Sequence, residues 1–259
     1  MLSILLLPQT ILILAAIIPA IFLLIKVYKS DKLEKEDPRF ILLLLISGII
    51  STLIASFLEE IGSFLLSIFF SSPTLLYNII LYYIVVALSE EGSKYLLLRK
   101  KTWNNENFNC KYDAVVYAVA VSLGFALWEN ILYVFRYGLS VALTRAITAI
   151  PGHCSFGVFM GLWYGEEREH TVYGERARAT MSRILTLVFP TLLHGTYDFL
   201  CTYAEDWKGT ITFVVFTLLL FFFSFFMVKK KSNEDHYLWL LLKRFYRASR
   251  KRFLEAFII

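Results

Sequence analysis

The stretch Leu75–Leu98, LLYNIILYYIVVALSEEGSKYLLL, decides the fold of this 259-residue chain. It is long and apolar enough to cross a bilayer as one helix, since about 20 apolar residues span about 30 Å of hydrocarbon. Yet it carries Glu90, Glu91 and Lys94 inside the apolar run. Charged groups at membrane depth are costly, so they are usually paired and usually functional. The stretch therefore predicts a membrane-spanning helix that contributes to a polar site.

Apolar runs of similar length recur along the whole chain. Hydrophobic residues make up 58% of the sequence and the mean hydropathy is +0.61, whereas soluble domains contain about 45–50% apolar residues. We predict seven spans, at residues 5–26, 41–58, 75–98, 114–136, 144–164, 184–203 and 211–228. The predicted fold is an all-α polytopic transmembrane bundle. Without a repeat or a low-complexity linker, residues 1–259 are predicted to form one domain, with the motif-bearing core at residues 75–203.

Basic residues indicate the orientation, because cytoplasmic connections of membrane proteins are enriched in Lys and Arg. Nearly all of them follow spans one, three and five or lie in the tail. The exceptions are Lys94, which lies within span three, and Arg136, Arg145 and Lys208, which lie on the opposite side. We therefore predict an outside N-terminus and a cytoplasmic C-terminus. The basic tail, residues 229–259, is predicted to end in an amphipathic helix on the anionic inner leaflet. Arg136, Arg145 and Arg183 are interpreted as flanks that extend from span ends toward the headgroups.

The connection between spans two and three, residues 59–74, begins with Glu59 and Glu60 and continues through an apolar run. We predict an outer loop with an interfacial helical segment, in which both glutamates face solvent or headgroups. The pair resembles Glu90-Glu91, however, so membership of the polar site stays open as an alternative.

Three further motifs place ionisable groups inside apolar runs. They are Phe125-Ala126-Leu127-Trp128-Glu129-Asn130, His153-Cys154-Ser155-Phe156-Gly157 and His194-Gly195-Thr196-Tyr197-Asp198. Together with the first span they bring four acids to membrane depth, at a cost on the order of 10 kcal/mol if unpaired, which rivals the net stability of a whole protein. The acids must therefore be protonated, paired or facing a shared wet cavity.

Four-residue spacing turns several of these groups to common helix faces. Lys94 lies four residues after Glu90, so the two are expected to pair, while Glu91 points about 100° away and need not do the same job. Asp198 lies four residues after His194 and could hold its imidazole. A purely structural ion pair between Glu90 and Lys94 is the alternative.

The middle two motifs follow the same rule. Phe125 and Glu129 share a face, and the adjacent Asn130 could orient a carboxylate or donate to an oxyanion; interhelical hydrogen bonding is the structural alternative. Gly157, four residues after His153, removes side-chain bulk and admits a substrate or another helix. At about 1.5 Å of rise per residue, all four motifs fall between the midplane and the outer leaflet. One cavity among spans three to six is therefore feasible.

In this order the motifs resemble those of the PrsW family of intramembrane proteases. The patterns EExxK, FxxxEN, HxxxG and HxxxD occur at residues 90–94, 125–130, 153–157 and 194–198 without departure. The wider superfamily includes the type II CAAX prenyl proteases and a non-catalytic scaffold subunit of gamma-secretase. The resemblance implies a multi-pass endopeptidase of a bacterial cell membrane. Its expected partner is a single-pass or membrane-anchored protein, such as an anti-sigma factor, cut on the extracytoplasmic side.

Under this hypothesis Glu90 or Glu91 activates a water molecule, and histidines polarise the carbonyl or stabilise the oxyanion. The predicted catalytic residues are Glu90, Glu91, Glu129, Asn130, His153, His194 and Asp198, supported by Lys94, Phe125 and Gly157. A metal version would use His153, His194 and an acid as ligands of Zn²⁺. No HExxH motif occurs, and we prefer the metal-free version, so no cofactor is predicted, with zinc as the alternative.

Two other classes of function use similar groups. A non-enzymatic membrane scaffold would bind partner helices through the same groove, and a proton-coupled or ion-coupled transporter would use buried acids and histidines as a relay. The absence of inverted repeats argues against the transporter. The net charge of +5 does not indicate nucleic acid, because the basic residues lie in short loops and the tail. The three scattered cysteines predict neither a disulfide framework nor a thiolate zinc site.

Overall fold

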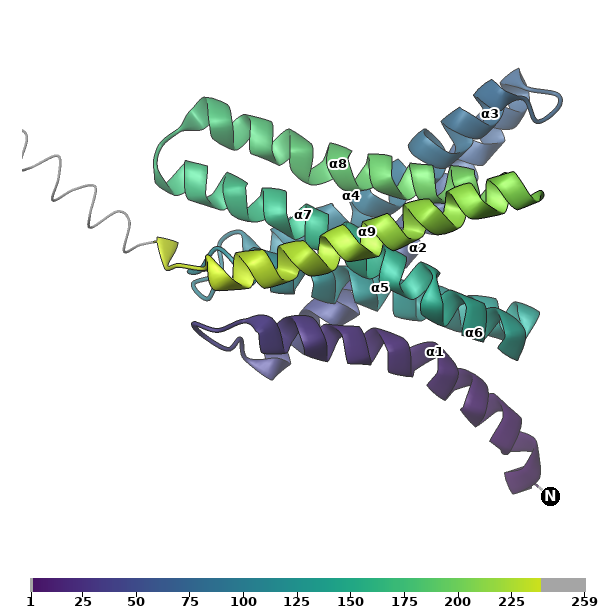
Figure 1. The fold of residues 1–259 in the computed structure, drawn as a ribbon, viewed down its shortest axis with the longest axis horizontal. Helices are drawn as coiled ribbons and strands as arrows, with labels where there is room; N and C mark the ends of the chain where they lie inside the picture. Colours follow the sequence, from purple (N-terminus) through teal and green to yellow (C-terminus); the bar gives the residue numbers. More distant parts are fainter. Residues whose placement is uncertain (1, 239–259) are drawn as a thin grey trace, which may run out of the picture.

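The computed structural model describes residues 2–238 as a bundle of helices (Figure 1). In chain order these are α1 (Leu2–Ser30), α2 (Pro38–Phe69), α3 (Leu75–Ile79), the π-helical η1 (Ile80–Ala87), α4 (Leu88–Thr102), α5 (Asp113–Tyr137), α6 (Leu139–Ile147), α7 (Ala149–Val172), α8 (Arg176–Thr202) and α9 (Trp207–Asn233). Within this part of the chain, seven helical segments are long and apolar enough to cross a membrane. The predicted all-α membrane bundle and its number of spans are confirmed. The predicted tail helix lies in residues 239–259, outside the described part.

Two of the seven spans are built from more than one helical element. The third span runs without a gap through α3, η1 and α4, from Leu75 to Thr102. Its π-helical part, η1, directly precedes the turn that carries Glu90 and Glu91; π-helical turns are rare and frequently occur at functional sites. The fifth span combines α6 and α7, which meet at Thr148.

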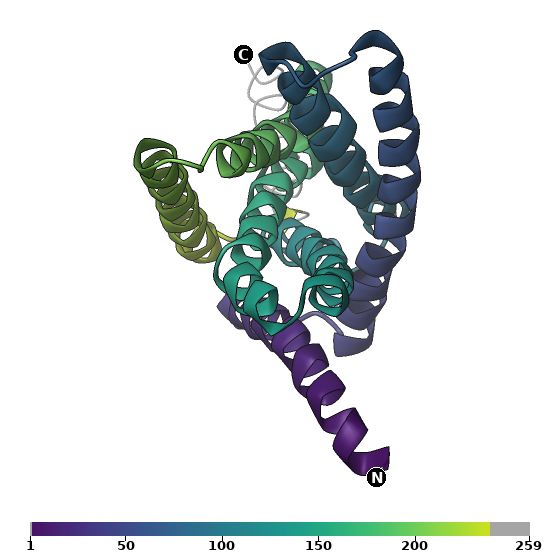
Figure 2. The ribbon, with the colours of Figure 1, turned by 90° about the vertical axis from the view of Figure 1, so that its right-hand side faces the viewer.

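Helix α5 is the centre of the bundle, as the view roughly along the helices shows (Figure 2). Of the residues in its membrane-spanning part, 78% are buried, a larger share than in any other described span. It packs mainly against α7, α2 and α1. Since its first two turns, AVVYAVAV at residues 114–121, are apolar on every side, the sequence already favours a central position.

Helices α2 and α5 cross at a pair of glycines. A Cβ atom added at Gly48 would lie 2.0 Å from the carbonyl oxygen of Val121, and one added at Gly124 would lie 2.0 Å from that of Leu45. Only glycine allows backbones to approach so closely, and small residues are typical of helix contacts in membranes. This crossing brings α2 alongside the span that carries the FxxxEN motif.

The two ends of the bundle differ in charge. The basic end, on the left of Figure 1, holds the connections 31–37, 103–112 and 173–175 and the segment 234–238. The opposite end holds the connections 70–74 and 203–206 and the α5–α6 junction at Gly138. The basic end is the one predicted to be cytoplasmic, and this orientation remains a prediction.

The expectation of an outer loop at residues 59–74 is wrong. Helix α2 continues to Phe69, so the connection is only residues 70–74. Glu60 is exposed, whereas Glu59 is half-buried and lines a cavity inside the bundle. Two adjacent charged residues require a membrane helix to end only if neither side chain has a polar environment inside the bundle. Here one of them faces a polar interior, so the helix continues.

Candidate active site

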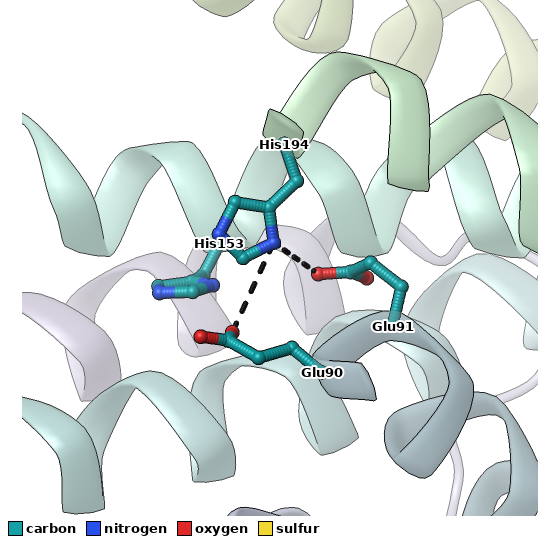
Figure 3. Close-up of side chains that lie close together, drawn as sticks. All are labelled: Glu90, Glu91, His153 and His194. Carbon is teal, nitrogen blue, oxygen red and sulfur yellow. Dashed lines mark hydrogen bonds and ion pairs between the residues drawn. The ribbon is translucent and has the colours of Figure 1, made fainter. Parts of the chain in front are cut away.

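Four ionisable side chains from three spans meet in the interior of the bundle (Figure 3). Glu90 and Glu91 come from α4, His153 from α7 and His194 from α8. One ligand atom of each lies within 4.8 Å of those of the others, and all four residues are buried. The helix faces that the sequence analysis required to converge do point toward one another.

A lysine ammonium lies among these groups. The Nζ atom of Lys94 is 3.0 Å from Glu90 Oε2, 2.8 Å from Glu91 Oε1 and 3.2 Å from His153 Nδ1. The expected Glu90–Lys94 pair is present, but Glu91 reaches the same ammonium, because residues three apart share a helix face as residues four apart do. An ammonium group only donates, so His153 Nδ1 accepts and its Nε2 carries the proton.

The ring of His194 lies between two carboxylates. Its Nδ1 is 2.9 Å from Glu91 Oε1, and its Nε2 is 3.3 Å from Asp198 Oδ2, in the pairing that the HxxxD spacing predicts. The Phe156 ring stacks on it, with centroids 4.6 Å apart and an angle of 18° between the planes. These three contacts fix both the position and the orientation of the imidazole.

Arg145, which we had interpreted as a span flank facing the headgroups, instead points into the site. Its Nη2 forms an ion pair with Glu129 Oε2 at 2.7 Å, and its Nε donates to Asn130 Oδ1 at 3.1 Å. The same Glu129 oxygen accepts from His153 Nε2 at 2.9 Å. A continuous chain therefore runs from Arg145 through Glu129 to His153. The only sequence signal for it was that Arg145 is one of the few basic residues away from the basic end.

The other residues of the predicted set have different surroundings. Asn130 is fully buried and donates its amide to the Ala16 carbonyl of α1 at 3.2 Å, so its side chain faces α1 and Arg145. A Cβ atom at Gly157 would lie 2.7 Å from Ser122 Cβ, so this glycine admits helix α5. The ring of Phe125 lies 3.8 Å from the Lys94 ammonium, a cation–π contact that covers the buried charge.

The site opens into a cavity of about 710 Å³. Glu90, His153 and His194 line it, whereas Glu91 is fully buried behind them. The lining continues through Arg136 and Thr144 to the opposite end of the bundle. Water and a peptide segment could therefore reach Glu90 from that end.

Comparison with known proteins assigns the chain to a family. The family described as "PrsW family intramembrane metalloprotease" matches residues 36–228, more than half of the chain. The chain belongs to the PrsW family. It is 33% identical to "Protease PrsW" of Bacillus subtilis over 201 residues, which are 74% of this chain and 84% of that protein. It is 32% identical to "Protease PrsW" of Oceanobacillus iheyensis over 186 residues, 72% of this chain and 80% of that protein. No solved structure gives a significant match.

Membership of the PrsW family confirms the resemblance that the motifs carry. The chain is an intramembrane protease, with the multi-pass helical architecture that the sequence predicts. The family description adds a metal, and the four clustered donors are of types that Zn²⁺ accepts.

The arrangement of these donors does not fit a metal ion held by all four residues. Lys94 already forms hydrogen bonds to Glu90, Glu91 and His153, three of the four. A zinc ion would lie about 2.0–2.2 Å from the same donor atoms, where it would compete for their lone pairs next to a positive charge. The ammonium thus occupies the place of a cation among these donors.

Proposed function

We propose that this PrsW-family protease hydrolyses a peptide bond of a membrane-anchored protein with a water molecule activated by Glu90. One observation carries the proposal: Glu90 is the member of the glutamate pair that lines the cavity, beside both histidines. Glu91 is fully buried and bonded to Lys94 and His194. Its role is therefore to orient these two side chains.

The reaction needs a base, a stabilised oxyanion and a proton for the leaving amine. Glu90 removes a proton from water as the water oxygen bonds to the carbonyl carbon. The developing oxyanion is stabilised by the positive charge of Lys94 and by the Nε2–H of His194, which lines the cavity and is shared between the oxyanion and Asp198. Glu90 then transfers this proton to the amide nitrogen and the C–N bond breaks. The products are a carboxylic acid, which keeps the second proton of the water, and an amine; exchange of that proton gives a carboxylate and an ammonium group.

The direction of the cavity supports the proposed side of cleavage and is compatible with the proposed substrate class. It extends toward the end of the bundle opposite the basic end. With the orientation predicted from the positive-inside rule, that end faces the extracytoplasmic side of the cell membrane. A membrane-anchored protein with a cleavable segment just outside the membrane, such as an anti-sigma factor, suits this position.

Cleavage of a single-pass model substrate by the purified protein tests the proposal. We expect the wild type to cleave and Glu90→Gln and His194→Ala to lose cleavage, since each removes one group of the proposed chemistry. Glu60→Gln is the matched control, because this neighbouring glutamate is exposed and does not line the cavity. Equal cleavage by the wild type and both site variants would overturn the proposal.

Metal removal tests the metal-free mechanism. We expect the active protein to contain no stoichiometric metal by elemental analysis and to keep its cleavage rate in the presence of a chelator. Stoichiometric zinc, with activity lost to the chelator and restored by zinc, would show that the metal displaces the Lys94 ammonium from these donors.

A further inference from the structure

Glu59 is the acidic side chain of the cavity that the proposed chemistry does not use. It lies on α2 together with Thr52 and Ser56, and all three line the cavity. Their spacings of four and three residues place them on one face of the helix. The continuation of α2 to Phe69 therefore gives the cavity a polar wall.

The other carboxylates of the cavity each have a basic partner. Glu90 is paired with Lys94, Glu129 with Arg145 and Asp198 with His194. Glu59 forms no hydrogen bond or ion pair within residues 2–238. Among the carboxylates that line the cavity, Glu59 is therefore the one that no cationic side chain contacts in the described part of the protein.

The surroundings of Glu59 belong to the active site. The charged groups that act on it are Glu129, His194, Lys94, Asp198 and Glu90. The basic groups among them are already in contact with other carboxylates. A carboxylate at this depth is costly without a partner. Glu59 therefore carries a charge that no cation of the described residues contacts, and Arg136, the remaining basic residue of the lining, lies over the Tyr137 ring instead.

We propose that Glu59 forms a subsite for a basic side chain of the substrate, lysine or arginine, near the scissile bond. The proposal rests on the proposed function, because it needs the substrate chain to enter this cavity. An extended chain advances about 3.3 Å per residue. Because Glu90 and Glu59 line the same cavity, we expect an extended substrate bound there to meet them with residues close in sequence. Lysine and arginine have apolar stems that can pack against the apolar side chains of the cavity, and a charged end group that can reach the Glu59 carboxylate.

A lysine scan of a cleaved model substrate tests the subsite. Each residue within four positions of the cleaved bond is replaced in turn by Lys, Gln or Glu, and kcat/KM is measured in detergent. For the wild type we expect Lys to be preferred over Gln by about tenfold at one position, the effect of about 1.4 kcal/mol of binding energy. Glu59→Gln should bring that ratio to about one, and Glu59→Lys should reverse it in favour of Glu. Glu60→Gln should keep the wild-type ratio.

The outcomes separate this inference from the function on which it rests. Cleavage by the wild type with no preference for Lys at any position would overturn the subsite and leave the protease function intact. A Glu59→Gln variant that slows all substrates equally would also overturn it, since Glu59 would then act in proton transfer or folding. Failure of the wild type to cleave any substrate would overturn the proposed function, and the subsite with it. Reversal of the preference by Glu59→Lys supports the subsite and shows that this variant folds.

Discussion

Two groups of buried acids, at different places in the bundle, are stabilised in different ways. In the cavity, Glu90 and Glu91 contact the Lys94 ammonium and Glu129 contacts the Arg145 guanidinium. The second group, which we call the basic-end acids, consists of the buried Asp31, Glu36 and Asp113 and the half-buried Asp235. Glu167, also buried near this end, is not one of them, because it forms ion pairs with Arg99 and Arg183. No ion pair to any of these four occurs among the described residues. Side-chain cations neutralise the first group, and neutral donors or no donors face the second.

Backbone groups hold two of the four basic-end acids. Asp113 Oδ2 accepts from the amides of Cys110 at 2.6 Å and Asn109 at 3.1 Å, and Asp235 Oδ1 accepts from the amide of Tyr112 at 2.8 Å. The Asp113 bonds hold the connection against the start of α5, and the Asp235 bond fastens it to the segment after α9. Backbone donors cannot move without unfolding the connection, whereas a lysine or arginine side chain can change partner. The first arrangement suits a structural clamp and the second suits chemistry.

The largest expected effect comes from Glu90→Gln. The substitution keeps the size of the side chain and removes the base, so we expect kcat to fall by about 10²- to 10⁴-fold. Because the buried Lys94 keeps its contact with Glu91, the thermal stability in detergent should stay close to that of the wild type. Activity and melting temperature measured on the same preparation check this; a variant that is active, or one that is inactive only because it unfolds, contradicts it.

The next largest effect is expected from Arg145→Gln. Without the guanidinium, Glu129 becomes a buried charge bonded only to His153, a loss of about 1–3 kcal/mol. We expect kcat to fall by about 10- to 100-fold, with Arg145→Lys recovering part of the rate because it restores a charge without the contact to Asn130. If Arg145→Lys and Arg145→Gln give the same rate, the positive charge at this position does not contribute to catalysis. The span-flank interpretation would then be restored.

The same kind of change at the basic end should affect stability instead of catalysis. Asp113→Ala leaves the amides of Asn109 and Cys110 without their acceptor, which costs about 1–3 kcal/mol. We expect a lower unfolding midpoint and an unchanged cleavage rate per folded molecule. A drop in rate without a change in stability would remove the distinction between the two groups of acids.

The smallest effect expected is a pH dependence of stability from the basic end. Burial raises the pKa of Glu36 from its ordinary 4.5 to about 7, although the Tyr117 hydroxyl donates to it at 2.7 Å. The folded protein then holds this proton to higher pH than the unfolded chain does. Stability should therefore fall as the pH rises from about 4.5 to about 7 and level off above that.

The variant Glu36→Gln isolates this contribution. Burial also raises the pKa values of Asp31 and Asp235, so we expect Glu36→Gln to flatten the dependence without abolishing it. Melting temperatures between pH 4 and pH 8 measure the slope. An unchanged slope in the variant would assign the effect to the other basic-end acids.

Much of the site could be predicted because its motifs follow helix periodicity. The pairs Glu90–Lys94 and His194–Asp198 lie at i,i+4 spacing, and the structure contains both contacts. Helix geometry fixes such contacts locally, so they do not depend on how the spans pack. The number of spans could be predicted for the same reason, since hydrocarbon thickness sets the length of each apolar run.

The contacts between spans could not be predicted in this way. The sequence predicts a loop position for Glu59, because a charged pair normally ends an apolar run, and a headgroup position for Arg145, because it lies near a span end. Asn130 was assigned to the chemistry, yet its amide faces α1. In each case the partner lies on another span, and one sequence carries no signal for the direction in which that span is turned.

The sequence by itself determined that this chain crosses a membrane seven times, which residues are ionisable at membrane depth, and that the motifs are those of the PrsW family. The cost of burying charge required those residues to find partners, whatever the packing. Only the tertiary structure decided who the partners are. The packing of six helices, α2 and α4 to α8, decides these partners. It puts Lys94 among three donors, seals Glu91 behind Glu90, brings Arg145 to Glu129 and leaves Glu59 facing the cavity. The physical reason is that the contact between two helices depends on their rotation and crossing, which glycines such as Gly48 and Gly124 set.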